Sequence, residues 1–215
     1  METATARTQR PDKRSEVLIG ALAVFARDGY TRASIDEIAA TASVSTRTIY
    51  NHFVDKATLF HEVIIASAAS VASAQLDAMD RHLAAIPDDA EALEAALTEF
   101  LHAWLAPVPE HRAHFALVRQ VNAELDHIPP TTVAAWQEAG PLRVLSALAG
   151  HLRRFADAGL ITVEDPDRAA LHLASLTAPT NSSLPALRSA RTSVAETMAA
   201  GIHVFLHGVL ARRPA

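Results

Sequence analysis

Apolar residues recur every three or four positions along most of the chain, with polar and charged residues between them. This spacing places the apolar side chains on one face of a helix and therefore predicts amphipathic helices. Prolines, glycines and short polar stretches separate the predicted helices, which are residues 12–28, 56–86, 88–106, 110–126, 130–139, 142–158, 165–180 and 189–212. No strand-like alternation, repeat or low-complexity segment competes with this pattern. The fold class is predicted to be all-α.

Between the first and second of these helices, the sequence predicts two short helices joined by a turn. Ser34 followed by Glu37 is a capping-box pattern, in which the hydroxyl and the carboxylate each accept a hydrogen bond from an unpaired helix N–H group. Residues 43–45 interrupt the helix that follows, and Ser45 is placed to cap a second one. Such a pair is a helix-turn-helix, whose second helix reads DNA. Its outward polar side chains, none of them acidic, are Thr46, Arg47, Asn51 and His52.

This region resembles the DNA-binding signature of the TetR family of bacterial transcriptional regulators, from about Val17 to Phe60. The residues that carry the resemblance are Ile38-Ala39, Ala42-Ser43-Val44-Ser45, Tyr50-Asn51-His52-Phe53 and Lys56. Ser43 departs from the pattern, because the family often has glycine at this tight turn. A left-handed backbone there costs a non-glycine residue roughly 1–2 kcal/mol. Arg47 is a second departure, since many members carry a small residue at that position.

The resemblance implies DNA contacts for eight residues at the matching positions. Thr46, Arg47 and Asn51 would face the bases. The phosphates would be held by Ser34, Ser45, Tyr50, His52 and Lys56, with help from the N-termini of two helices. The alternative is an ordinary helical hairpin with a polar face.

The chain after residue 55 resembles the C-terminal domain of such regulators, a helical bundle that binds a small molecule and forms dimers. Within it, residues 124–176 resemble the AefR-like subfamily. The expected domains are therefore a helix-turn-helix DNA-binding domain at 1–55 and a ligand-binding and dimerisation domain at 56–215. A basic arm precedes the first helix and is either a solubilising tail or a contact to the DNA backbone or minor groove; it contains Arg7, Arg10, Lys13 and Arg14.

Candidate effector residues lie on the central predicted helices. Apolar walls with a few polar groups are typical of small-molecule sites, and the alternative is that the aromatic residues belong to the core. The candidates are Phe100, Trp104, Phe115, Arg119, Asn122 and Trp136. Apolar faces on the last two helices would form a four-helix bundle across the two-fold axis of a homodimer, or else close the protomer's own core. They contain Leu171, Ala174, Val194, Met198, Ile202, Phe205 and Val209.

The net charge of −5 argues against binding nucleic acid over the whole surface, so the distribution of charge matters. Residues 1–56 hold eight Lys and Arg against seven Asp and Glu, whereas the remainder holds eleven against seventeen. The relative positive charge therefore lies with the helix-turn-helix. The absence of cysteine excludes disulfide frameworks and thiolate metal sites. With no signal-peptide pattern and no uninterrupted apolar run of about 18 residues, we expect a cytoplasmic protein with no membrane partner.

The sequence predicts neither a metal site nor a catalytic site. His203 with His207, and His111 with His114, are spaced to share a helix face, but no acidic partner lies at a telling spacing in the sequence. No nucleophile elbow, phosphate-binding glycine loop or paired-carboxylate motif is present, so no cofactor and no enzymatic activity are expected.

The resulting hypothesis is a DNA-binding transcriptional regulator that acts as a homodimer. It would bind a palindromic, double-stranded operator as a repressor, and a small-molecule effector would release it. One alternative is a helical protein that sequesters a ligand without reading DNA. A more remote one is a helical enzyme that uses Arg119, Glu124 and the histidines.

Overall fold

The computed structural model describes residues 12–106, 108–177 and 194–207, apart from the side chain of Val194. Every regular element in these ranges is a helix, which confirms the predicted all-α class. The chain divides into two compact units. The first combines residues up to 71 with residues 108–140, and the second combines residues from 72 to 107 with those from 141 onward.

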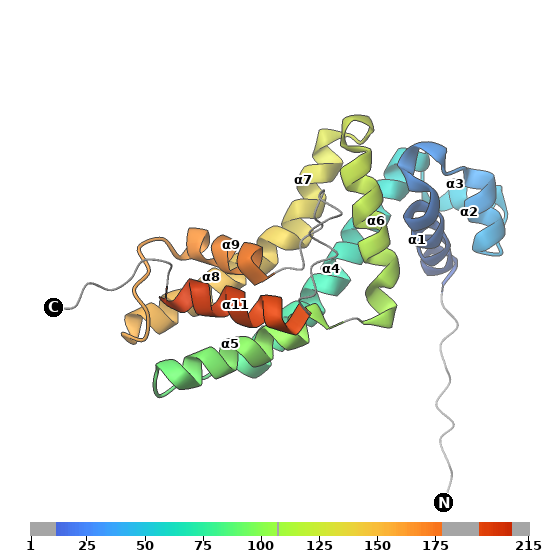
Figure 1. Ribbon diagram of the computed structural model, residues 1–215. Helices are drawn as coiled ribbons and strands as arrows, with labels where there is room; N and C mark the ends of the chain where they lie inside the picture. The colour runs from blue at the N-terminus through green and yellow to red at the C-terminus, as the bar shows by residue number, and fades with distance from the viewer. Residues whose placement is uncertain (1–11, 107, 178–193, 208–215) are drawn as a thin grey trace, which may run out of the picture. The chain divides into compact units, whose positions relative to one another are not determined.

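The N-terminal part of the first unit consists of α1 (Lys13–Arg32), α2 (Ile35–Thr41) and α3 (Thr46–His52), which are drawn in blue in Figure 1. Asp12 caps α1 through a 2.7 Å hydrogen bond from the Ser15 N–H group. The left-handed φ of 81° at Gly29 breaks the helix where the sequence predicts its end, and one further turn follows. α1 and α2 pack so closely that a Cβ on Gly20 would lie 2.7 Å from the Cβ of Ala42.

The apolar stripes of these helices meet in a common core. Phe25, Ile38 and Ile49 are fully buried, and the ring of Phe25 packs edge-on against Phe60 with the centroids 4.9 Å apart. The core continues into α6 (Arg112–Ala123) and α7 (Pro130–Ala139) through residues such as Leu117. One helix was expected over residues 110–126. Instead, the short 3₁₀ helices η1 (Pro109–His111) and η2 (Leu125–His127) flank α6.

α4 (Lys56–Leu83) contributes side chains to the cores of both units, and it ends three residues before the predicted limit. Asp55 caps it by accepting a 2.7 Å hydrogen bond from the Thr58 N–H group, and this bond lowers the pKa of the Asp55 carboxyl group. Among the described helices, α4 alone has the length and composition to cross a membrane. Its apolar side chains, such as Leu59 and Met79, are nevertheless buried in the two cores.

The second unit is built from the end of α4 with α5 (Ala90–Leu105), α8 (Pro141–Asp157), α9 (Pro166–Thr177) and α11 (Val194–His207). Asp89 caps α5, one residue later than predicted. α9 and α11 lie against each other, since a Cβ on Gly201 would come within 2.4 Å of the Leu176 carbonyl oxygen. The carbonyl at the end of α4 binds α8, where His151 lies 2.9 Å from the Leu83 oxygen.

These units do not follow the boundary expected between residues 55 and 56, because α6 and α7 pack with the N-terminal helices. The assignment of residues 1–55 and 56–215 to separate functional domains stays a prediction.

Candidate functional site

The helix-turn-helix predicted from the sequence is present in α2 and α3. Ser34 accepts a 3.2 Å hydrogen bond from the Glu37 N–H group, and Ser45 accepts a 3.1 Å hydrogen bond from the Thr48 N–H group. Both serines therefore cap their helices as predicted. The carboxylate of Glu37 pairs with Arg27 instead of reaching back to its own cap, so the reciprocal half of the capping box was predicted wrongly.

The turn between α2 and α3 is left-handed at a non-glycine residue. Ser43 has a φ of 54°, and it is the one non-glycine residue with positive φ in the described part of the chain. The Ser43 N–H group donates to the Ala40 oxygen at 3.2 Å and the Val44 N–H group to the Ala39 oxygen at 3.0 Å. This pair of hydrogen bonds is a Schellman motif, which satisfies carbonyl groups at the end of α2 and offsets the cost of the left-handed residue.

α3 separates its residues into a buried face and an exposed face. Ile49 and the following Phe53 are buried, which anchors the helix on α1. Tyr50 is 56% exposed. Three further polar residues predicted to contact DNA, Arg47, Asn51 and His52, are also exposed, whereas Thr46 is half-buried. The helix thus presents hydrogen-bonding groups without a carboxylate.

Lys56, whose expected phosphate contact stays a prediction, is hydrogen-bonded to the end of α1. Its ammonium group donates to the carbonyl oxygens of Tyr30 at 2.9 Å, Ala33 at 3.1 Å and Thr31 at 3.3 Å. It also lies 4.9 Å from the centre of the Tyr30 ring. Three carbonyl groups therefore use its three N–H donors, and the positive charge lies at the C-terminal end of α1, where the helix dipole favours it.

The predicted basic arm is only partly described. Lys13 and Arg14 belong to the first turn of α1, whereas Arg7 and Arg10 lie outside the described residues. Arg14 pairs with Glu62 and lies 5.4 Å from the centre of the Phe53 ring. Its charge therefore helps to hold α1 against the end of the helix-turn-helix.

A contact between α6 and the end of α1 was missed by the sequence analysis. Oε2 of Glu124 accepts hydrogen bonds from the N–H group of Thr31 at 2.9 Å and from its hydroxyl group at 3.0 Å. A Cβ on Gly29 would lie 2.2 Å from the same carboxylate, so the approach requires glycine there. The two partners are far apart in the sequence, and no local pattern indicates that they meet.

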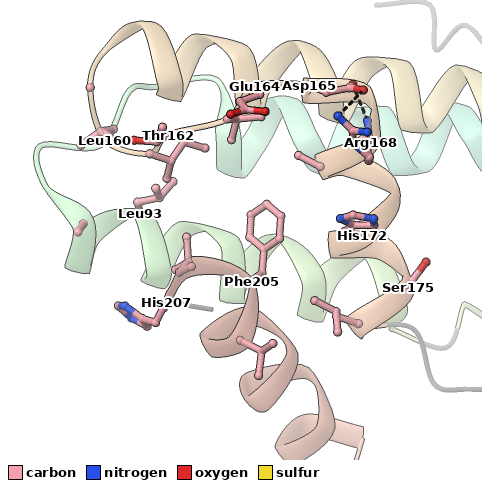
Figure 2. A pocket seen from close by; sticks show the side chains of 18 residues that line it. Leu93, Leu160, Thr162, Glu164, Asp165, Arg168, His172, Ser175, Phe205 and His207 are labelled. Atoms are coloured by element: carbon pink, nitrogen blue, oxygen red, sulfur yellow. Dashed lines mark hydrogen bonds and ion pairs between the residues drawn. The ribbon is translucent and has the colours of Figure 1, made fainter. Parts of the chain in front are cut away.

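A cavity with a volume of about 890 Å³ lies in the second unit. Its walls come from the start of α5, the segment between α8 and α9, α9 itself and the end of α11. Figure 2 shows the Phe205 ring pointing into this space, with His172 on one wall and the ion pair between Arg168 and Asp165 on another. The cavity combines apolar surface with charged groups at one side.

None of the six residues predicted to bind an effector lines this cavity or a second, smaller cavity in the first unit. Phe100 is fully buried in the core of the second unit, stacked on Trp104 with the ring centroids 5.2 Å apart. Phe115, Arg119 and Asn122 lie on the exposed part of α6. Trp136 is buried in the first unit, and its Nε1 has no hydrogen-bond partner within the described part of the chain. Their ligand-binding role stays a prediction.

The smaller cavity, about 220 Å³ in volume, lies in the first unit between α1, α4 and the start of α6. Ser67 and His114 line it, and the Ser67 hydroxyl oxygen lies 2.8 Å from Nδ1 of His114. Burial lowers the pKa of His114 to about 4, with a smaller contribution from the neighbouring His111. His114 is therefore neutral near pH 7, a buried and satisfied histidine.

The apolar faces predicted to form a dimer are only partly exposed. Leu171 of α9 is 51% exposed. Met198 and Ile202 of α11 are buried in the core of their own protomer, at 2% and 0% exposure, so their assignment to a dimer face was wrong. Phe205 lines the cavity. Val209 and the side chain of Val194 lie outside the described residues.

Comparison with known protein families matches both parts of the chain. The model described as bacterial regulatory proteins, tetR family, matches residues 17–63. The model described as AefR-like transcriptional repressor, C-terminal domain, matches residues 92–207.

Individual proteins agree with these matches. A solved TetR-family transcriptional regulator from Mesorhizobium loti MAFF303099 is 30% identical, with a TM-score of 0.73, over 95% of this chain and 98% of its own. The flavonoid-responsive regulator FrrA is 28% identical, with a TM-score of 0.65, over 90% of this chain and 95% of its own. The HTH-type transcriptional regulator AcrR of Shigella flexneri is 29% identical over 53% of this chain, which spans only 57% of AcrR. Because the AefR-like model alone covers more than half of the chain, the protein belongs to the TetR family of bacterial transcriptional regulators.

Proposed function

We propose that this regulator is a repressor that binds a palindromic operator as a homodimer and is released by a small-molecule effector. The observation that carries the proposal is the exposed face of α3, which presents Arg47, Asn51 and His52 without an acidic group. Side chains of these types hydrogen-bond to base edges and phosphates in the major groove. The match to an AefR-like repressor domain supports repression over activation.

In this proposal the residues of the helix-turn-helix divide into base readers and phosphate binders. Thr46, Arg47 and Asn51 face the bases. Phosphate oxygens are bound by Ser34, Ser45, Tyr50 and His52, with the N-termini of α2 and α3 directed at the backbone. Lys56 acts indirectly in this proposal: its ammonium group donates to carbonyl groups at the end of α1 and so keeps α1 in place beside the helix-turn-helix.

We place the effector in the cavity of the second unit. Its volume of about 890 Å³ falls within the roughly 300–1,000 Å³ usual for small-molecule sites. Leu93, Leu160 and Phe205 supply apolar surface, while Arg168 and His172 supply polar groups. FrrA, a regulator of similar fold, is described by its name as responsive to flavonoids, which are small molecules. This supports a small-molecule effector.

We assign the dimer contact to the exposed face of α9. Three faces of this helix differ in their surroundings: Ala170 and Leu173 are buried in the core, and Arg168 and His172 line the cavity. Leu171, by contrast, is exposed at 51%, a large apolar side chain that lines neither cavity. The Leu171→Asp variant is expected to sediment as a monomer at micromolar concentration, whereas a monomeric wild type that still binds DNA would refute the dimer.

Effector binding and DNA binding are coupled in this proposal through α4. α4 enters the cores of both units, so an effector that prefers one conformation of the second unit biases a helix that begins beside α3. The dimer's two recognition helices must match the spacing of the operator half-sites. A change in that spacing lowers the affinity for the operator. The size of the loss is set by how much more tightly the effector binds one conformation of the protein than the other.

Selection of bound fragments from random DNA by the full-length protein tests the proposal. We expect an enriched palindrome, and Arg47→Ala should relax the preference at one symmetric pair of positions, a loss of about 1–3 kcal/mol of discrimination. Arg143→Ala, an exposed arginine on α8, is the control and should return the wild-type palindrome. An unchanged palindrome with Arg47→Ala would show that this residue does not read bases.

A protein that sequesters its ligand without reading DNA is the remaining alternative. It predicts ligand binding with no enriched DNA sequence at any salt concentration, whereas the repressor predicts both. A cytoplasmic location is part of the proposal, since a bacterial regulator that binds operator DNA must share a compartment with that DNA.

A further inference from the structure

Two histidines of α11 and a glutamate of α5 meet in the second unit. Donor atoms of Glu94, His203 and His207 all lie within 4.8 Å of one another. Nε2 of His207 is 3.8 Å from Oε2 of Glu94, and the two histidine rings have centroids 4.5 Å apart. We infer that these three side chains form a binding site for a divalent transition-metal ion of the zinc class. This inference is independent of DNA binding and of the proposed effector.

The backbone that carries these donors is held by buried packing. Met198 and Ile202, on the neighbouring face of α11, are buried in one core with Leu93 and Leu97 of α5. Figure 1 shows α11 running beside α5. Because Ile202 precedes His203 and Leu93 precedes Glu94, the core contact fixes the register that brings the donors together. Donors on rigid helices keep their geometry better than donors on loops.

The spacing on α11 supports a shared ligand. Side chains at i and i+4 of a helix lie on one face, so His203 and His207 point toward the same region. Glu94 is half-buried and supplies the third donor from the facing helix. Metal–ligand bonds of about 2.0–2.2 Å require the donors to approach more closely than 4.8 Å. The exposed histidine side chains are free to rotate by the small amount needed.

The donor set selects the class of ion. Two imidazole nitrogens with one carboxylate suit zinc, cobalt, nickel or copper, whereas magnesium and calcium prefer oxygen ligands. Three protein ligands leave the fourth tetrahedral position to water or to a bound molecule. His207 also lines the large cavity, where Figure 2 shows it at the end of α11. An ion bound here would therefore cross-link α11 to α5 at the edge of that cavity.

The competing interpretation is an ion pair between His207 and Glu94 without a metal. A direct measurement of metal binding distinguishes these two interpretations. It uses the full-length, tag-free protein after treatment with a chelator. Zn²⁺ is titrated in competition with a chromophoric chelator, and Co²⁺ is followed by its visible absorption, which reports tetrahedral coordination. We expect one ion per chain at this site and a higher Tm in the presence of zinc.

Three variants and one control locate the binding. His203→Ala, His207→Ala and Glu94→Gln should each weaken zinc binding by at least about tenfold, the lower end of what loss of even an outer-shell partner causes. His102→Ala is the control, because this exposed histidine of α5 lies outside the three-residue group and lines neither cavity. It should bind zinc as the wild type does.

The inference is overturned if the three variants bind zinc with wild-type affinity, if His102→Ala weakens binding equally, or if zinc binds only at millimolar concentration. Glu94→Gln preserves the size of the side chain, so it keeps the test valid if a histidine variant fails to fold. Circular dichroism of the metal-free variants checks the fold separately.

Discussion

Replacing Lys56 with methionine separates two roles that this residue could have. Methionine keeps a long apolar side chain and removes the ammonium group that donates to the carbonyl oxygens of Tyr30, Thr31 and Ala33. Hydrogen bonds to a charged group contribute about 1.5–3 kcal/mol each when well buried, and a cation at a helix C-terminus contributes about 0.3–1 kcal/mol. Lys56 is half-exposed, so we expect a total loss of about 2 kcal/mol in the free energy of unfolding.

The assay combines urea unfolding with DNA binding at several salt concentrations. If Lys56 acts through position, the variant unfolds at lower urea concentration and binds all DNA sequences more weakly. The slope of log K against log salt concentration, where K is the association constant for DNA, stays the same as in the wild type. Tyr50→Phe is the control: Tyr50 is exposed, so loss of its hydroxyl should weaken DNA binding while leaving unfolding unchanged.

The opposite result would refute the reasoning. A direct phosphate contact by Lys56 predicts that Lys56→Met lowers the salt dependence by about 0.9 in slope, because one fewer counterion is released. In that case the unfolding curve would coincide with that of the wild type.

Two further predictions concern stability. Between pH 7.5 and 5, the wild type should lose about 2 kcal/mol relative to His114→Asn, because the unfolded histidine is protonated below pH 6.5 while the buried ring stays neutral to about pH 4. The wild type therefore keeps its full free energy of unfolding above about pH 6.5 and loses part of it as the pH drops. The prediction is contradicted if the free energy of unfolding, measured with urea, changes equally with pH in the two proteins. Gly201→Ala should destabilise the second unit by about 1–3 kcal/mol, since its Cβ would meet the Leu176 carbonyl oxygen at 2.4 Å. Gly150→Ala, with nothing within 4 Å of an added Cβ, should be neutral or stabilising by thermal unfolding, and equal effects of the two changes would refute the close contact.

The features predicted correctly from the sequence are those set by neighbouring residues. Ser34 and Ser45 cap their helices because a hydroxyl group at that position reaches an N–H group three residues later. Gly29 and Gly159 adopt positive φ where helices were expected to end. The turn at Ser43 is left-handed, as the family pattern predicts, and hydrogen bonds within the same turn stabilise it.

Tertiary structure decided the features that join residues far apart in the chain. The hydrogen bonds of Lys56 join it to carbonyl groups more than twenty residues earlier. Glu124 meets the end of α1, and Glu94 meets His203 and His207, only because separate helices pack side by side.

The same distinction explains the dimer face. Helical spacing shows that Met198 and Ile202 share an apolar face, but the same spacing fits a core within one protomer and an interface between two. The structure buries both against α5 and leaves Leu171 exposed. Periodicity alone determines that a face is apolar, while packing determines what covers it, because the hydrophobic effect rewards any burial and has no direction of its own.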